Sequence, residues 1–142
     1  MSLYDQDFFA WTQRQAELLR AGRLDALDLE HIAEEIEGMG RSEKRELISR
    51  LAVLLLHLLK WQFQPGLRSV SWRLSVEEQR RKLARLLDDN PSLRALLSQA
   101  VEDAYGDALL AAERETGLSR ATFPTVCPYP FDEAISSAFW PD

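Results

Sequence analysis

The feature that most constrains the fold is a stretch near the middle of the chain, residues 51–59, in which almost every side chain is apolar. Only His57 interrupts this run, so a helix formed by these residues has no polar face to turn toward water. Such a helix is stable only when other elements surround it. The run is shorter than the roughly 20 apolar residues that span a membrane. We therefore predict a central core helix from Ser42, which can cap it, to Gln64, where Pro65 stops it.

Apolar residues recur at helical spacing along nearly all of the chain, and no segment shows the alternation that indicates a half-buried strand. The sequence therefore predicts an all-α fold, a compact bundle of about five main helices. The 142 residues, 46% of them apolar, are the usual size of one core, so a single helical domain over 1–142 is predicted. The tail after Gly117 is rich in proline and aromatic residues and is expected to pack irregularly on the bundle.

The predicted helices are placed by residues that favour helix starts and ends. Their expected starts are about Asp5, Asp28, Ser42, Ser75 and Asn90. Gly22 and Gly117 are the expected caps after the first and last helices. The helix that begins at Asp28 is expected to end or kink at Gly38 and Gly40 and to bury an apolar stripe. The members of this stripe are Leu29, Ile32, Ile36 and Met39.

Charged residues fall into three blocks of alternating sign. Residues 1–40 hold three Arg or Lys against nine Asp or Glu, residues 41–94 hold twelve against six, and residues 95–142 hold two against eight. This pattern fits either acidic segments packed around a basic middle or a basic surface offered to an anionic partner. The net charge of −6 makes nucleic acid an unlikely partner, because nucleic-acid-binding domains are typically strongly basic.

Several classes of protein are disfavoured by what the chain lacks. Cys127 is the only cysteine, so neither an internal disulfide nor a cysteine zinc site can form. The acidic start of the chain does not resemble an export signal. No phosphate-binding loop, nucleophile motif or complete set of metal ligands is present, so no cofactor and no metal is predicted. We expect a cytoplasmic protein.

The first candidate site is the flank of a helix shared by Asp28, His31 and Glu35, which are spaced by three and four residues. Carboxylate and imidazole groups at such spacing can hold a metal in helical bundles. No second helix offers matching ligands, however. The favoured interpretation is that Asp28 caps the helix and that Glu34 and its neighbours form a solvated acidic face.

The second candidate is His57, which lies away from the centre of the leucine stripe of the core helix. It could meet Glu34 or Glu35 from the preceding helix as a carboxylate–imidazole pair. Because no nucleophile motif accompanies it, a structural, hydrogen-bonded histidine is favoured. Gln62 is expected to serve as a polar tie between helices.

The third candidate is a basic stretch interleaved with aromatic residues, a combination that can grip phosphates and stack on bases. Its basic members are Arg68, Arg73, Arg80, Arg81, Lys82 and Arg85, and its aromatic members are Trp61, Phe63 and Trp72. Pairing of these cations with the acidic first and last blocks is the favoured interpretation.

Short strings spread along the chain carry a family resemblance. They are Tyr4-Asp5-x-Asp7-Phe8 with Trp11, Glu34-Glu35-Ile36-Glu37 with Gly40-Arg41-Ser42, His57-Leu58-Leu59-Lys60-Trp61-Gln62 with Pro65, Ser71-Trp72, Pro91-Ser92-Leu93, Glu115-Thr116-Gly117-Leu118 and Phe123-Pro124-x-x-Cys127-Pro128. With these strings the chain resembles the bacterial family known as domain of unknown function 29. The resemblance implies a compact all-α domain and brings no established activity, substrate or cofactor.

Three functional hypotheses follow from these observations. The leading one is a non-enzymatic helical protein-interaction module with a protein partner or self-association. The first alternative is a small-ligand or metal-dependent enzyme that uses the region of Glu35 and His57, and the second is a phosphate or nucleic-acid binder that uses Arg68 to Arg85. The residues proposed for ligand or partner binding are Glu34, Glu35, His57, Trp61, Trp72 and Arg73.

Overall fold

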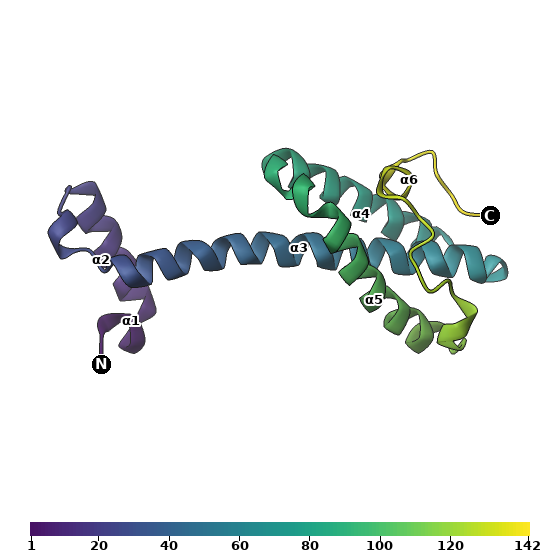
Figure 1. Ribbon diagram of the computed structural model, residues 1–142, viewed down its shortest axis with the longest axis horizontal. Coiled ribbons are helices and arrows are strands. Elements are labelled where there is room, and N and C mark those ends of the chain that lie inside the picture. The colour runs from purple at the N-terminus through teal and green to yellow at the C-terminus, as the bar shows by residue number, and fades with distance from the viewer. The chain divides into compact units, whose positions relative to one another are not determined.

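The computed structural model describes residues 1–142 and consists of helices joined by short turns, with no strand (Figure 1). The predicted all-α fold is therefore confirmed. The helices in chain order are α1 (Leu3–Gln6), α2 (Phe8–Arg20), α3 (Leu29–Phe63), α4 (Val70–Asp89), α5 (Leu97–Thr116) and α6 (Phe131–Ile135). None of them is long and apolar enough to cross a bilayer.

Contacts along the backbone divide the chain into two compact units, residues 1–42 and residues 43–142, called here unit 1 and unit 2. Unit 1 contains α1, α2 and the first turns of α3. Unit 2 contains the rest of α3, together with α4, α5, α6 and the tail. The single domain expected from chain length stays a prediction, because two units that share a helix can unfold together or separately.

In unit 1, the helix predicted from Asp5 to Arg20 is interrupted at Asp7. This residue leaves helical geometry, and its carboxylate accepts a hydrogen bond from the backbone N–H of Ala10 at 3.0 Å, which starts α2. After α2, Gly22 adopts a φ of 71°, which a glycine reaches without strain, so the expected cap is confirmed.

Helix α3 runs without a break through the region where two helices were predicted. The expected end at Gly38 and Gly40 and the expected cap at Ser42 are therefore wrong. A glycine inside a helix costs about 1 kcal/mol relative to alanine, which is too little to end a helix whose neighbours favour the same conformation. The predicted stop at Pro65 is correct, since α3 ends at Phe63 and a 3₁₀ turn follows.

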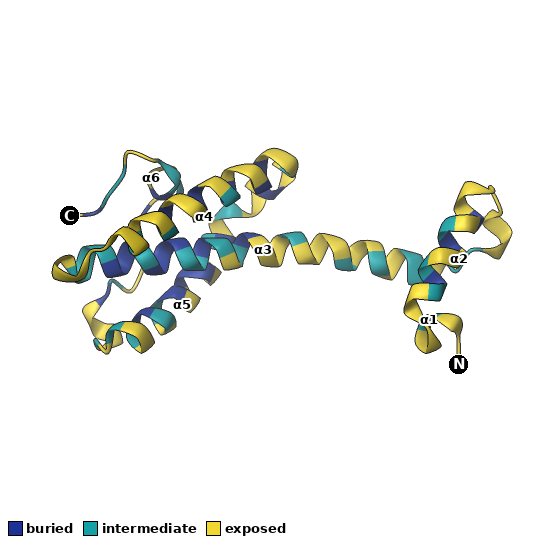
Figure 2. Ribbon diagram, turned by 180° about the vertical axis from the view of Figure 1, so that it is seen from behind, coloured by how far each residue is buried: buried dark blue, intermediate teal, exposed yellow.

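The core of unit 2 is built around the apolar run of α3, as predicted (Figure 2). Its most deeply buried side chains come from α3 and α4 and are Leu47, Leu51, Leu54, Leu55, Leu58, Leu59, Val76, Leu83 and Leu87. Helix α5 faces this core with small residues, which allow close approach of the backbones. These are Ala100, Ala104, Ala108 and Ala112.

Helix α4 begins earlier than predicted. The hydroxyl of Ser69 accepts a hydrogen bond from the N–H of Trp72 at 3.2 Å, so Ser69 is the N-cap and the predicted start at Ser75 is wrong. The predicted start at Asn90 marks a 3₁₀ turn over Pro91–Leu96, from which α5 continues.

The tail packs on unit 2, as predicted. Phe123 and Tyr129 are buried in the core cluster. Arg80 of α4 holds the last part of the tail, because its guanidinium donates to the carbonyl oxygen of Ala134 at 2.8 Å and to that of Phe139 at 2.7 Å. These bonds satisfy carbonyls that the irregular backbone leaves without helical partners.

Candidate functional site

The first candidate site is a network of aromatic and polar side chains in unit 1, centred on Asp28. The carboxylate of Asp28 accepts from the indole N–H of Trp11 at 3.0 Å and contacts Nδ1 of His31 at 2.7 Å. It also accepts from the backbone N–H of His31 at 3.4 Å, so the predicted cap is present. The hydrogen bond to Asp28 raises the pKa of His31, and the same bond lowers the pKa of Asp28.

Tyr4 joins this network to Glu35. Its ring stacks on the imidazole of His31 with centroids 3.9 Å apart, and its hydroxyl donates to Oε1 of Glu35. The bond to the carboxylate, with further contributions from burial and nearby acidic groups, raises the pKa of Tyr4 to about 12. Glu34, one residue earlier, is exposed and forms no ion pair. The network therefore ties α1 and α2 to the start of α3.

The structure does not gather three or more metal-ligating side chains at any place. The carboxylates of Asp28 and Glu35, two of the three residues considered for a metal, are engaged by different partners, His31 and Tyr4 respectively. The interpretation of Asp28 as a helix cap is thus the one that the geometry supports.

His57 is hydrogen-bonded within α3, where its Nδ1 lies 2.8 Å from the carbonyl oxygen of Val53. Glu35 belongs to the same helix and lies in unit 1, whereas His57 lies in unit 2. The pair envisaged between them required two separate helices and a break near Gly38. Since α3 has no such break, the two groups that the enzyme hypothesis combines are not brought together.

The other proposed residues lie in unit 2 and have partners there. The ring of Trp61 is 4.5 Å from that of Trp140, and the ammonium of Lys60 lies 4.8 Å from the ring of Trp72. Arg73 forms an ion pair with Glu77 one turn along α4 at 3.0 Å.

The basic stretch forms its ion pairs with carboxylates of its own block and not with those of the acidic end blocks, so the favoured pairing was wrong. Lys82 pairs with Glu78 at 2.9 Å along α4. Arg68 and Arg80 donate to backbone carbonyl oxygens, three of the four in the tail. Arg81 and Arg85 form no ion pair. One pair, Lys60 with Glu115 at 3.0 Å, does join the middle block to the last.

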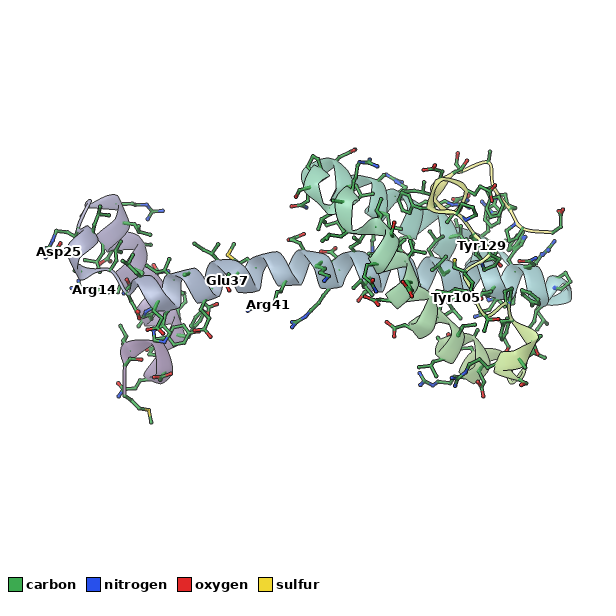
Figure 3. The ribbon with its side chains drawn as sticks, viewed as in Figure 1. Arg14, Asp25, Glu37, Arg41, Tyr105 and Tyr129 are labelled. Atoms are coloured by element: carbon green, nitrogen blue, oxygen red, sulfur yellow. The ribbon has the colours of Figure 1, made fainter.

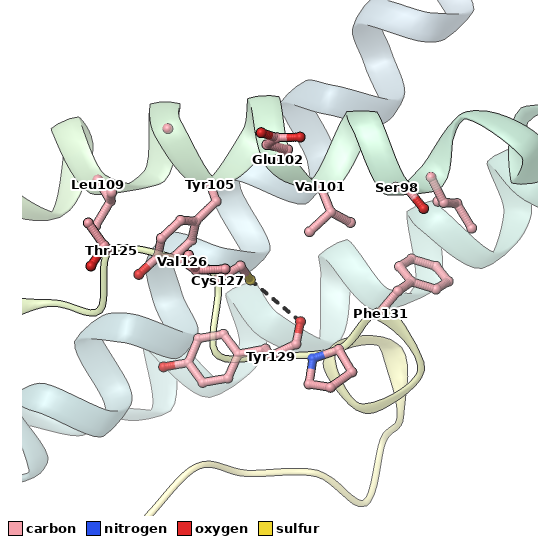
Figure 4. A pocket seen from close by; sticks show the side chains of 13 residues that line it. Ser98, Val101, Glu102, Tyr105, Leu109, Thr125, Val126, Cys127, Tyr129 and Phe131 are labelled. Atoms are coloured by element: carbon pink, nitrogen blue, oxygen red, sulfur yellow. Dashed lines mark hydrogen bonds between the residues drawn. The ribbon is translucent and has the colours of Figure 1, made fainter.

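Sequence reasoning missed a groove between α5 and the tail (Figure 4). Its volume is about 570 Å³. Tyr105 and Tyr129, two of the residues that line it, are labelled in Figure 3. The one feature of the sequence that could have indicated the groove is Gly106. It is a glycine inside a strongly periodic helix and leaves a position without a side chain.

Sequence reasoning also misplaced the apolar stripe at the start of α3, which we call the α3 stripe (Leu29, Ile32, Ile36 and Met39). Leu29, Ile36 and Met39 are 65%, 62% and 68% exposed, so the predicted burial is wrong for these three. Ile32 is half-buried. Along the same helix, Glu37 and Arg41 are paired at 3.8 Å (Figure 3).

Comparison with known proteins identifies a family for this chain but no relative whose activity is known. The family model described as "Domain of unknown function DUF29" matches residues 3–140. No curated protein and no solved structure matches the chain. The match covers nearly the whole sequence and agrees with the resemblance seen in its short strings. The chain belongs to the DUF29 family of domains of unknown function.

Proposed function

We propose that this protein is a helical protein-interaction module that associates with a second copy of itself. The observation that carries this proposal is the exposure of the α3 stripe. Leu29, Ile36 and Met39 are spaced by seven and three residues, the spacing by which one helix packs against another. Large apolar side chains aligned on one exposed face favour association, because their contact with water is unfavourable.

The charge around the α3 stripe indicates the kind of surface that it contacts. Glu35 flanks the stripe and Glu43 continues its line along α3. Residues 1–40 hold three basic against nine acidic residues. An acidic, apolar surface is best complemented by a basic, apolar one.

Unit 2 offers such a surface on α4, which we call the α4 face (Val70, Leu74, Arg81 and Arg85). Val70 and Leu74 are 63% and 49% exposed, although both are large and apolar. Arg81 and Arg85 are exposed and form no ion pair. The α4 face therefore combines hydrocarbon with two unpaired positive charges, the complement of the α3 stripe.

Because both surfaces occur on every chain, two copies can exchange them. The α3 stripe of one copy contacts the α4 face of the other, and the same contact is repeated by symmetry. A closed, two-fold arrangement of this kind makes two equal contacts and leaves neither surface free for further growth. The lone cysteine, which has no partner for an internal disulfide, fits a reducing compartment, and we place the protein in the bacterial cytoplasm.

The test measures the mass of the full chain by light scattering during size-exclusion chromatography. We expect a dimer at low salt that weakens at high salt, because the contact pairs exposed charges. The double variants Ile36→Ser with Met39→Ser and Arg81→Glu with Arg85→Glu are both expected to be monomers. The controls are Leu110→Ser and Arg114→Glu, which change an exposed leucine and an exposed arginine outside both surfaces.

Each result bears on the proposal. A wild-type chain that is monomeric at every concentration overturns it. A dimer that survives the Arg81 and Arg85 changes but not the Ile36 and Met39 changes overturns the assignment of the α4 face. Circular dichroism of each variant separates loss of association from loss of folding.

A further inference from the structure

The groove between α5 and the tail, called here the α5 groove, has the size of a small-molecule site. Its volume of about 570 Å³ falls in the usual range of roughly 300–1,000 Å³. Helix α5 contributes two rows of residues, each spaced by about one turn so that its members align. The apolar row is Leu97, Val101, Tyr105 and Leu109, and the second row is Ser98, Glu102 and Gly106. The opposite side is formed by the tail residues Thr125, Val126, Cys127, Tyr129, Pro130 and Phe131 (Figure 4).

Bonds within the protein hold the two aromatic walls in place. The hydroxyl of Tyr105 donates to the carbonyl oxygen of Pro124 at 2.5 Å, and that of Tyr129 donates to Gln62 at 2.6 Å. Both residues are at least 95% buried. Their hydroxyls are therefore occupied, and both side chains are fixed, almost fully covered parts of the lining. Walls that are already ordered reduce the entropy lost when a ligand binds.

Gly106 leaves space where a side chain would normally project. It lies inside α5 with ordinary helical backbone, so its conformation does not require glycine. A Cβ built at this position would meet no atom within 4 Å. Glycine here costs about 1 kcal/mol relative to alanine, and no packing contact offsets that cost. The missing side chain instead widens the groove beside Glu102.

The charge of the groove selects the ligand. Glu102 is the only charged residue that lines it, and no arginine or lysine does. The segment that supplies the lining, residues 95–142, holds eight acidic residues against two basic ones. A carboxylate beside an apolar wall attracts a cation that carries hydrocarbon and repels a fatty acid or a phosphate.

Cys127 contributes to the neutral wall and not to covalent chemistry. Burial raises the pKa of its thiol, so the group stays protonated near neutral pH. The thiol also donates to the carbonyl oxygen of Tyr129 at 3.5 Å. The groove therefore has no reactive nucleophile to transfer a group to or from a ligand.

We propose that the α5 groove binds a small amphiphilic amine. The hydrocarbon of the ligand lies against Val101, Leu109 and Phe131, which line the groove and are half-buried, and its ammonium pairs with Glu102 at the open edge beside Gly106. This inference does not depend on self-association, since every residue that it uses belongs to unit 2 of one chain.

The test uses three probes of equal length that differ only in their head group: octylamine, octanol and octanoate. Binding to the full chain is measured by amide and methyl shifts in NMR spectra, with resonances of Val101, Leu109 and Phe131 as reporters. We expect octylamine to bind about two- to fivefold more tightly than octanol, the range that one exposed ion pair contributes. Octanoate is expected to bind most weakly.

Two variants separate the charge from the cavity. Glu102→Gln is expected to lower the affinity for octylamine about two- to fivefold, to the level of octanol, and to leave the affinity for octanol unchanged. Asp107→Asn removes an exposed carboxylate of α5 outside the groove and is expected to change neither probe. Gly106→Leu fills the groove and is expected to abolish binding of all three probes, while circular dichroism shows the fold intact.

The proposal is overturned if octanoate binds as tightly as octylamine, or if the shifts caused by octylamine fall outside the α5 groove. It is also overturned if Asp107→Asn weakens octylamine as much as Glu102→Gln does, because a general attraction to an acidic surface would then explain the binding. If none of the three probes shifts any resonance, the proposal is overturned as well.

Discussion

The hydroxyl of Tyr129 donates to Oε1 of Gln62 at 2.6 Å and thereby ties the tail to the central helix. The same hydroxyl lies 3.2 Å from the carbonyl oxygen of Leu58. Gln62 is thus the polar tie that its position in the sequence predicted, although its partner is the tail and not another helix. Because Tyr129 is buried, no water replaces the donor when it is lost.

Tyr129→Phe is expected to destabilise unit 2 by about 1 kcal/mol, because it leaves the half-buried amide oxygen of Gln62 without its donor. Urea unfolding measures the change. The control is a double-mutant cycle with Gln62→Leu, in which the two changes are expected to be coupled and not additive. Strict additivity would show that the bond contributes nothing.

Glu115→Gln is expected to cost more stability than Lys60→Met. Lys60 is only 8% exposed, and its ammonium has Glu115 as its single carboxylate partner, at 3.0 Å. Loss of the carboxylate leaves a buried positive charge unpaired, whereas loss of the ammonium leaves a half-exposed carboxylate that water can solvate. Thermal unfolding of both variants tests this order, and the reverse order would contradict it.

Two glycines of unit 2 are expected to respond to alanine in opposite directions. Gly106→Ala should stabilise α5 by about 0.5–1 kcal/mol, because its Cβ would enter open space in an ordinary helix. Gly117→Ala should destabilise by about 1 kcal/mol, because the φ of 74° at that position is unfavourable for any residue with a Cβ. Chemical denaturation measures the change in the free energy of unfolding for each variant. Changes of the same sign would argue against the cap at Gly117.

The stability of unit 1 is expected to depend on pH through His31 and Asp28. The pKa of His31 is raised above 6.5, so the stability from its protonated form is complete below pH 6.5 and is lost as pH rises through the raised value. The pKa of Asp28 is lowered below 3.8, so its contribution is complete above pH 3.8 and is lost as pH falls through the lowered value. Unit 1 should therefore be most stable between pH 3.8 and 6.5.

Urea unfolding followed through the indole resonance of Trp11 measures this dependence within unit 1. An NMR titration of wild type and Asp28→Asn isolates the cause, since asparagine preserves the helix cap but removes the charge. The variant is expected to lower the pKa of His31. A titration that is the same in both proteins would show that Asp28 does not stabilise the imidazolium.

The sequence predicted the elements whose signals are local and chemical. Pro65 ends α3 because proline cannot continue the ladder of hydrogen bonds, and Gly117 ends α5 because only glycine adopts its φ easily. The apolar run of residues 51–59 identified the centre of unit 2, since such a helix has no stable alternative to burial.

The features that escaped prediction are those that a short sequence pattern does not decide. Gly38 and Gly40 look like a helix end, yet their intrinsic cost is smaller than the gain from continuing α3. The burial of Ile36 and Met39 was inferred from spacing, and spacing shows which residues share a face but not whether anything covers it. The α5 groove arises only where the tail returns to α5, so no short window of sequence contains it.

The most direct test of self-association mixes the two interface variants. Ile36→Ser with Met39→Ser keeps an intact α4 face, and Arg81→Glu with Arg85→Glu keeps an intact α3 stripe. Each variant alone is expected to be a monomer in light scattering. Their equimolar mixture is expected to form a heterodimer through the one remaining contact, weaker than the wild-type dimer. A mixture that stays monomeric while the wild type is a dimer would contradict the pairing of stripe and face, and a wild type that stays monomeric would contradict self-association altogether.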